Sequence, residues 1–245
     1  AAAATVTHVA DGEVTNAFSY TLENAEFYSN ATKTEGKLKI TPATLTIVTE
    51  NGSKTYDGTA LTAAGSIDGF VTVDGVTETA TFKVTGSQTA VGNSLNSYSL
   101  VFDGTAVESD YTRAETIGTL VVSKDDTSLT IVSGTQNWPY DGTDHTNREY
   151  TVTYGEDSGT ATLNEDGTYS YELSTGDMIT ITPAAAATVK DVTDGEVTNA
   201  FSYTLENAEF YSDVTKTEGK LSITAIEVTI TTGSAEKAYD GTPLT

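Results

Sequence analysis

The element of this chain with the clearest chemical potential is Tyr-Asp-Gly, which occurs three times and is followed each time by Thr. An exposed Tyr beside a carboxylate could contact a ligand. Asp-Gly is also a common turn, and a preceding Tyr can anchor the end of a strand. Because a fold requirement recurs in every repeat, the sequence favours the structural role. The three copies are Tyr56, Asp57 and Gly58; Tyr140, Asp141 and Gly142; and Tyr239, Asp240 and Gly241.

The middle copy follows the only Trp of the chain, Trp138, with Pro139 between them. An indole beside a Tyr and a carboxylate could stack on a sugar or on a partner protein, which makes Trp138, Tyr140 and Asp141 candidate ligand-binding residues. The alternative is that Trp138 packs across a domain junction, and we expect packing to be its main role. Lys54 and Lys237 occupy the position of Trp138 in the other two copies.

Other groups suited to catalysis or metal binding are sparse. The two histidines, His8 and His145, lie at non-equivalent positions of the repeat, so neither a zinc site nor a His-based triad is expected. No carboxylates have the spacing of an EF-hand, and a calcium site formed by linker loops would draw on Asp125 and Asp126. A glycosidase pair of carboxylates needs a cleft, which small β units do not provide. We therefore expect a protein that is not an enzyme and has no cofactor, with calcium as the one open alternative.

The charge balance restricts the partners. Twelve Lys and Arg residues oppose 35 Asp and Glu residues, which gives a formal net charge of -23. Such a field repels nucleic acids and anionic lipid surfaces. No apolar run approaches the length of about 18 residues that a membrane-spanning helix needs, and the first residues lack the basic region of a signal peptide. The absence of Cys excludes disulfides and thiol chemistry.

An internal repeat organises the chain. Residues 1–62 recur as residues 184–245, and the gapless alignment at an offset of 183 positions gives 45 identities in 62 positions. The spacing of the Tyr-Asp-Gly elements alternates between shorter and longer, so a short and a long repeat form a doublet. Both ends cut through a repeat, and we expect the chain to be a window on a longer protein. The predicted divisions are the C-terminal part of a long repeat (1–41), a complete short repeat (43–124), a complete long repeat (127–224) and the N-terminal part of a further repeat (226–245).

Within the repeats, apolar and polar residues alternate with a period of two, which indicates half-buried strands of antiparallel sheets. Residues 160–173 read as a hairpin that turns at Asp166-Gly167. Residues 183–195 are expected to form a loop or one short turn. Six to eight short strands per repeat favour an all-β tandem array of immunoglobulin-like sandwiches, with a β-grasp-like sheet as the alternative. The residues predicted to be buried are Tyr98, Leu100, Phe102, Phe201, Tyr203 and Leu205.

The junctions between repeats resemble those of bacterial surface proteins with tandem MBG and YDG domains. In those families a Gly-x-Leu-x-Ile strand passes through a short linker into a Leu-Thr-Ile strand and a Tyr-Asp-Gly element. The resemblance covers the whole chain and implies a stalk or adhesin region of a large cell-surface protein, without catalytic residues. The matching residues before the Tyr-Asp-Gly elements are Tyr28, Gly36, Leu38, Ile40, Leu45 and Ile47; Tyr111, Gly118, Leu120, Val122, Leu129 and Ile131; and Tyr211, Gly219, Leu221, Ile223, Val228 and Ile230.

Two functions from different classes fit these observations. The favoured function is an extracellular stalk on a bacterial cell surface, in which each repeat has the neighbouring repeats as its partners. It is favoured because the doublet copies are nearly identical in strands and loops alike. The alternative is an adhesive module for host glycoprotein, mucin or polysaccharide, and lateral or end-to-end assembly into a filament is a third reading. Without Cys, stiffness rests on packing, on a metal or on an isopeptide bond, for which Lys37 and Lys220 are the candidate lysines.

Overall fold

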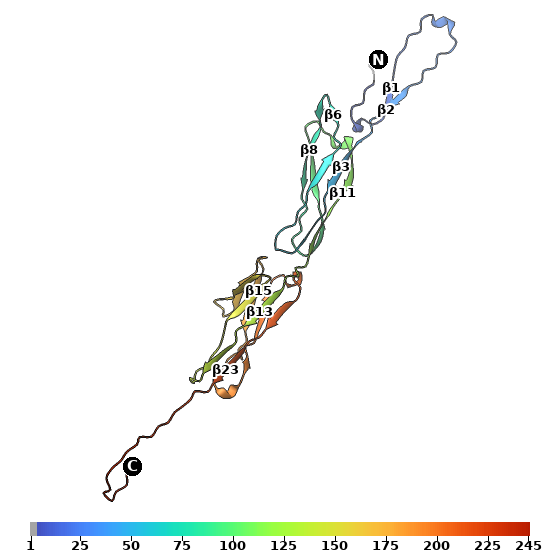
Figure 1. Cartoon of the computed structure of the whole chain (residues 1–245). Coiled ribbons are helices and arrows are strands. Elements are labelled where there is room, and N and C mark those ends of the chain that lie inside the picture. Colours follow the sequence, from blue (N-terminus) through green and yellow to red (C-terminus); the bar gives the residue numbers. More distant parts are fainter. Residues whose placement is uncertain (1–3) are drawn as a thin grey trace. The chain divides into compact units, whose positions relative to one another are not determined.

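The computed structural model describes residues 4–245, which form strands, turns and loops (Figure 1). The helical segments of these residues are 3₁₀ turns of three residues each, so the all-β prediction is confirmed, and the helix of a β-grasp-like sheet is not formed. The chain divides into two compact units, unit 1 (Ala1–Asp125) and unit 2 (Asp126–Thr245). The 3₁₀ turns are η1 (Val9–Asp11), η2 (Ala25–Phe27), η3 (Glu108–Asp110), η4 (Val192–Asp194) and η5 (Ala208–Phe210).

Unit 1 distributes its strands over several small sheets, with orders β11-β3-β5, β4-β12-β9, β10-β8, β6-β7 and β1-β2. The strands are β1 (Val14–Asn16), β2 (Gly36–Leu38), β3 (Ala43–Thr49), β4 (Gly52–Thr55), β5 (Gly65–Asp68), β6 (Thr72–Val73), β7 (Val76–Thr77), β8 (Thr79–Val84), β9 (Gly92–Leu95), β10 (Tyr98–Asp103), β11 (Tyr111–Thr116) and β12 (Thr119–Ser123).

Unit 2 contains sheets with orders β16-β15-β13-β22, β14-β23-β20 and β17-β18-β19-β21. Its strands are β13 (Leu129–Ser133), β14 (Gln136–Pro139), β15 (Tyr150–Tyr154), β16 (Asp157–Thr160), β17 (Thr162–Leu163), β18 (Tyr169–Glu172), β19 (Met178–Pro183), β20 (Val197–Thr198), β21 (Phe201–Leu205), β22 (Val214–Thr217) and β23 (Lys220–Thr224). The predicted hairpin is confirmed, because Thr162 pairs with Ser170 and Leu163 with Tyr169 around the Asp166-Gly167 turn. Pro183 ends β19, and residues 184–195 form loop, turn and η4 as expected, with one isolated bridge from Val189 to His145.

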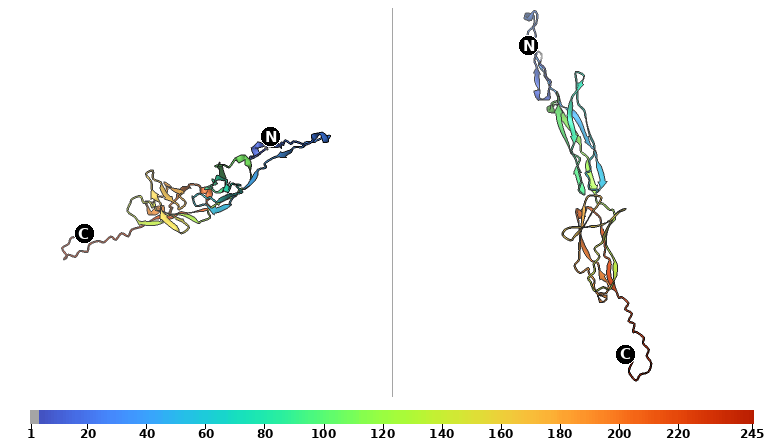
Figure 2. Two further views of the ribbon diagram at one scale, coloured as in Figure 1. Left: turned by 90° about the horizontal axis from the view of Figure 1, so that it is seen from above. Right: turned by 90° about the vertical axis from the view of Figure 1, so that its left-hand side faces the viewer.

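The first and last strands of each repeat pair in parallel. The sequence predicted antiparallel sheets only, so this parallel pairing was not expected. In the short repeat β3 pairs with β11 and β4 with β12, and the two strands of each pair lie side by side (Figures 1 and 2). In the long repeat β13 pairs with β22 and β14 with β23. We call each of these two-part pairings a terminal ladder. Parallel strands can pair only through a long connection, and here the rest of the repeat supplies it.

The two parts of each terminal ladder keep one register across a kink. Tyr111 pairs with Ala43 at the start of the short-repeat ladder, and Ser123 pairs with Thr55 at its end, both at a separation of 68 residues. In the long repeat Leu129 pairs with Val214 and Pro139 with Thr224, both at a separation of 85 residues. The chain therefore enters a repeat at one end of its ladder and leaves it at the other end.

The terminal ladders also carry much of the core, because alternate residues of their strands point inward. Leu45, Ile47 and Leu120 are fully buried in the short repeat, as are Ile131 and Leu221 in the long repeat. Burying a side chain of this size stabilises a fold by about 1.5–3 kcal/mol. The remaining core of the long repeat comes from its other strands and includes Tyr150, Val152, Ile179, Ile181 and Phe201.

Of the six residues predicted to be buried, Phe201 is buried and the other five are only half-buried. Tyr98, Leu100 and Phe102 alternate as expected, but β10 pairs with β8 alone, and this two-stranded ribbon is covered only in part. Tyr203 and Leu205 lie in β21, the outermost strand of its sheet. The period of two identified the face of each strand correctly, but it does not report how deeply a strand is covered.

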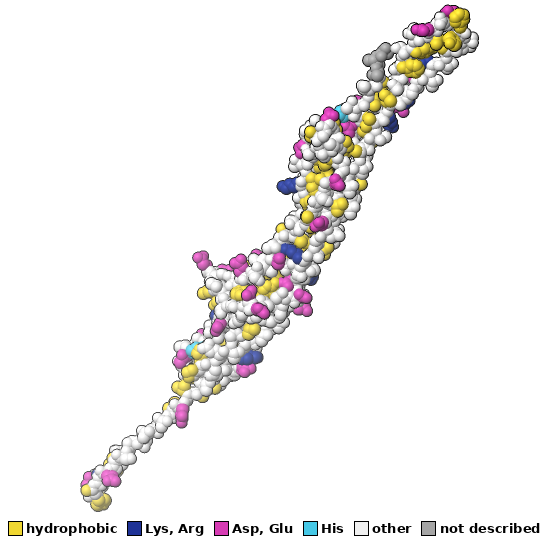
Figure 3. Space-filling view, turned by 45° about the horizontal axis from the view of Figure 1, so that its top comes forward, with side chains coloured by type: hydrophobic (Ala, Val, Ile, Leu, Met, Phe, Trp, Pro, Cys, Tyr) yellow, Lys and Arg dark blue, Asp and Glu magenta, His cyan; other side chains and the backbone are white. Residues whose placement is uncertain are grey.

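The duplicated segment shows which contacts create burial. Phe18 and Tyr28 are 45% and 62% exposed, whereas Phe201 and Tyr211, at the same positions of the second copy, are each 3% exposed. Local contacts are the same in both copies, since Lys33 lies 5.1 Å from the ring centre of Phe18 and Lys216 lies 4.8 Å from that of Phe201. The difference arises from residues 127–182, which complete the long repeat around the second copy. Apolar side chains are accordingly visible on the N-terminal segment in Figure 3.

Candidate functional site

The Tyr-Asp-Gly-Thr elements form the same turn three times. The Asp141 carboxylate accepts hydrogen bonds from the Thr143 backbone N–H and hydroxyl, each at 2.8 Å. Asp57 accepts the same two bonds from Thr59, and Asp240 accepts them from Thr242. The Gly after each Asp has a positive φ of 76° to 80°, a conformation that a side chain would strain. The Thr is therefore as much a part of the turn as the Asp-Gly pair.

A basic side chain completes each turn. The Lys54 ammonium donates to Asp57, and together with the Thr59 bonds this lowers the pKa of Asp57 to about 2. In the long repeat Trp138 occupies the position of that lysine, and His145 takes over the contact, with Nε2 lying 3.0 Å from Asp141 Oδ1. The Thr143 N–H and hydroxyl, followed by His145, lower the pKa of Asp141 to about 2.

The Tyr of the element is an anchor only where its repeat is complete. Tyr56 is 6% exposed, and its N–H donates to the Ser123 carbonyl at the end of the ladder. Tyr140 makes the same backbone bond to Thr224 but keeps 40% of its surface exposed. Tyr239 is 98% exposed, although the turn after it has formed. The turn is thus encoded locally, whereas burial of the Tyr requires the last strand of the repeat.

Trp138 is covered from two sides within unit 2. It packs against the buried cluster of Val189, Leu221 and Ile223, and its ring stacks on that of His145, with centroids 5.0 Å apart and planes at 21°. The packing expected for Trp138 occurs inside the repeat rather than across a domain junction. Because His145 covers one face of the Trp138 ring, a sugar could stack on that face only after His145 moved. Ligand binding by Trp138, Tyr140 and Asp141 stays a prediction.

No group of three or more His, Asp or Glu side chains in residues 4–245 is arranged to hold a metal ion. The calcium candidates differ in environment, since Asp125 is 3% exposed and Asp126 lies on the surface. No helix of residues 4–245 is long and apolar enough to cross a membrane. Asp and Glu side chains are scattered over the visible face of each unit (Figure 3).

The other histidine belongs to a contact inside unit 1. His8 Nδ1 lies 2.6 Å from Asp110 Oδ2, and the Val9 N–H donates to Asp110 Oδ1 at 2.7 Å. Hydrogen bonding to Asp110 raises the pKa of His8 and lowers that of Asp110. His8, Asp110 and Tyr111 line a groove of about 570 Å³, together with valines of the β6–β7 hairpin. One His and one Asp make an ion pair that ties η1 to η3.

The lysines suggested for an isopeptide bond lie on the surface beside unsuitable partners. Such a bond joins a Lys to an Asn or Asp side chain. Lys220 Nζ instead lies 3.1 Å from Thr198 Oγ1 and 3.7 Å from Glu196, and Lys37 Nζ lies 3.0 Å from Thr15 Oγ1. Neither geometry supports the bond.

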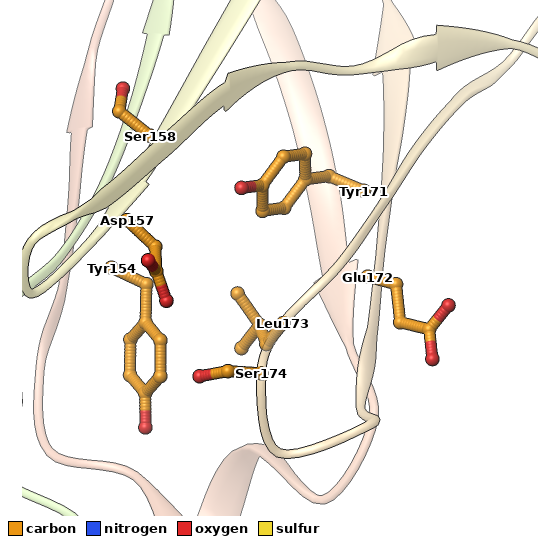
Figure 4. A pocket seen from close by; sticks show the side chains of 7 residues that line it. All are labelled: Tyr154, Asp157, Ser158, Tyr171, Glu172, Leu173 and Ser174. Atoms are coloured by element: carbon orange, nitrogen blue, oxygen red, sulfur yellow. The ribbon is translucent and has the colours of Figure 1, made fainter.

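A polar pocket of about 350 Å³ opens between β15, β16 and the end of β18 in unit 2 (Figure 4). Tyr154 and Tyr171 line it with Asp157, Ser158, Glu172, Leu173 and Ser174. Figure 4 shows Tyr171 and Leu173 on the pocket side of the strand, whereas the Glu172 carboxylate points away. A β-carbon at Gly159 would lie 2.7 Å from the Tyr171 ring, so Gly159 makes room for that ring.

The groups that line this pocket can contact a sugar ring. An aromatic ring with hydroxyls and one carboxylate can stack on a sugar ring and bond to its hydroxyl groups. Because Glu172 points away from Asp157, the two do not form the facing pair that glycoside hydrolysis needs.

Sequence reasoning missed a buried Asn in each complete repeat. Asn96 and Asn199 are both 0% exposed. The Asn199 side-chain N–H₂ donates to the carbonyls of Gly134 and Asn147, both at 2.9 Å, and that of Asn96 donates to the carbonyl of Glu50 at 3.0 Å. Each Asn thus binds one carbonyl at the kink of its terminal ladder, that of Glu50 or Gly134, and Asn199 also binds the loop carbonyl of Asn147.

A sequence signal for this Asn exists. In both repeats it stands two residues before the aromatic residue that opens an alternating strand, as Asn96 before Tyr98 and Asn199 before Phe201. The backbone N–H of Asn96 donates to the Gly118 carbonyl at 2.8 Å, and that of Asn199 donates to the Gly219 carbonyl at 2.9 Å. Both glycines lie at the kinks of the terminal ladders. An Asn at this position is informative because a buried side-chain N–H₂ group needs acceptors, which the backbone carbonyls supply.

Comparison of this chain with protein-family models, with curated proteins and with solved structures gives no match.

Proposed function

We propose that this chain is a non-catalytic structural part of a stalk or fibre in a large extracellular repeat protein of a bacterial cell surface. The observation that carries the proposal is the parallel pairing of the first and last strands in each complete repeat. A repeat built in this way takes in the chain at one end and releases it at the other. Repeats joined in series then add length rather than folding back.

The connections support the same proposal because they are short. The strand β12 ends at Ser123 and β13 begins at Leu129, and β2 ends at Leu38 before β3 begins at Ala43. Four or five linker residues give little freedom to an attached domain compared with a long flexible linker. The excess of carboxylates, at a net charge of -23, favours repulsion between neighbouring chains and keeps them soluble.

Small-angle scattering on chains with one, two and three copies of residues 43–225 tests the stalk. The proposal expects the maximum dimension to increase by nearly equal steps with each copy. A maximum dimension that grows with about the cube root of chain length would contradict it, because this is how compact globules scale.

An adhesive module is the second candidate, and the pocket between Tyr154 and Tyr171 is the observation that favours it. The candidate ligands are glycans of host glycoproteins, mucins or polysaccharides. A stalk without an adhesive role should bind mucin and glycan arrays no better than an unrelated acidic β protein. Saturable binding that Tyr171→Ala removes and Tyr20→Ala leaves unchanged would establish the adhesive role, because Tyr20 is exposed far from the pocket in sequence.

A further inference from the structure

The terminal ladder of the short repeat is long and keeps one register across its kink. It contains six paired positions between β3 and β11 and four between β4 and β12, and the register does not slip between the two parts. The bond from the Tyr56 N–H to the Ser123 carbonyl, at 2.9 Å, extends it to the Tyr-Asp-Gly-Thr turn. The ladder therefore runs through the whole length of the first and last strands.

Side chains replace the missing backbone bonds at the kink. The Gly118 N–H donates to the Thr49 hydroxyl at 2.9 Å, and the Thr119 N–H donates to the Asn51 side-chain oxygen at 2.7 Å. The long repeat has the same device, since the N–H groups of Gly219 and Lys220 donate to the Ser133 and Thr135 hydroxyls. Two repeats with different sequences thus keep the ladder bonded across the kink by the same means.

The direction of tension follows from the strand directions. Tension along an array pulls on residue 43, where the chain enters the short repeat, and on residue 123, where it leaves. The two positions lie at opposite ends of one parallel ladder. Pulling them apart slides β3–β4 past β11–β12, so all the bonds of the ladder carry the load together. In an antiparallel hairpin pulled from its open end, the bonds break one after another.

We propose that the terminal ladder is a mechanical clamp, so that each repeat resists force along the chain far better than force in other directions. This inference rests on the proposed stalk function, because only a tethered array is loaded along its chain. Forced unfolding depends on the unfolding rate rather than on equilibrium stability alone. The clamp works by requiring many hydrogen bonds to break before any part of the repeat extends.

Single-molecule pulling on the full chain tests the clamp, because the natural chain has no Cys and introduced cysteines are unique attachment points. Thr41→Cys with Lys124→Cys loads the ladder in shear. Thr41→Cys with Val107→Cys loads the same folded repeat from one end of the ladder, so that the strands peel apart. Unfolding in shear should release about 230 Å of chain, from about 3.4 Å per residue over residues 43–123 less the folded ladder.

The expected result is an unfolding force several-fold higher in shear than in peeling at the same loading rate. Thr49→Val, which removes the hydroxyl bridge at the kink, should lower the shear force. Thr81→Val is the matched control, because it removes a hydroxyl bond to Asp103 in the β8–β10 ribbon outside the ladder, and it should leave the shear force unchanged.

Equal forces in the two directions would overturn the clamp, whatever the Thr49→Val chain does. That outcome would leave a passive stalk intact, since scattering tests the stalk separately. Conversely, compact scattering would overturn the stalk while the dependence on pulling direction persisted.

Discussion

The buried Asn beside the kink of the long repeat offers a sharp test of how the ladder is held. Asn199→Ala removes two hydrogen bonds to the carbonyls of Gly134 and Asn147, both at 2.9 Å. The chain supplies its own control in Asn16, which has identical neighbours in sequence but lies exposed on a segment without the long-repeat ladder.

The magnitude follows from burial. Asn199 is 0% exposed, so its removal leaves two buried carbonyls without a donor, at a cost of about 1–3 kcal/mol for each group. Water that enters the space left by the side chain restores part of this loss. We expect the free energy of unfolding of the long repeat to fall by about 2–4 kcal/mol. Asn16→Ala should change the free energy of unfolding by no more than about 0.5 kcal/mol, because Asn16 is exposed.

Trp138 makes the assay specific for one repeat. It is the only Trp of the chain and packs on the cluster of Val189, Leu221 and Ile223. Urea unfolding followed by its fluorescence therefore reports on the long repeat alone. A shift of the midpoint for Asn199→Ala no larger than that for Asn16→Ala would refute the role given to the buried amide.

Three further outcomes are expected. Phe201→Ala should destabilise the long repeat by about 3–5 kcal/mol in the same fluorescence assay. Phe18→Ala, at the exposed copy of that position in unit 1, should lower the stability of unit 1 by less than about 1 kcal/mol when unfolding is followed by circular dichroism; equal losses would contradict the assignment of the core. In an NMR titration Asp141 should ionise with a pKa of about 2, below its ordinary value of 3.8, and Thr143→Val should raise that pKa. Because the folded pKa is the lower one, the stabilisation from this carboxylate is complete above about pH 4 and is lost as the pH falls towards 2. Gly118→Ala should prevent folding of the short repeat, as judged by circular dichroism, because the added β-carbon would lie 2.2 Å from the Glu50 carbonyl oxygen; a folded variant would show that the kink is less tightly packed than described.

The features that could be predicted from the sequence are local ones. Alternation identified most strands and their inward faces, and Asp-Gly identified the turns. The Asp240 turn shows why such predictions succeed, since it forms with Lys237 and Thr242 although Tyr239 is almost fully exposed. Turn chemistry of this kind needs only residues within a few positions of one another.

The features that could not be predicted depend on residues far apart in the chain. Nothing in β3 or β11 alone indicates that they pair in parallel across 68 residues, because the same alternation suits an antiparallel neighbour. The stacking of His145 on Trp138 and the half-burial of Tyr98 likewise depend on how the rest of the repeat covers them. The candidate site was the least predictable feature, because the pocket of Tyr154 and Tyr171 is formed by separate strands and has no sequence motif of its own.

The most direct test of the central claim is the distance between the two ends of one terminal ladder. Spin labels on Thr44→Cys and Lys124→Cys in the full chain report where the chain enters and leaves the short repeat. Parallel pairing over twelve positions at about 3.3 Å per residue predicts a distance of about 40 Å. A distance below about 20 Å would put both positions at the same end of the repeat, as antiparallel pairing requires, and would contradict the account.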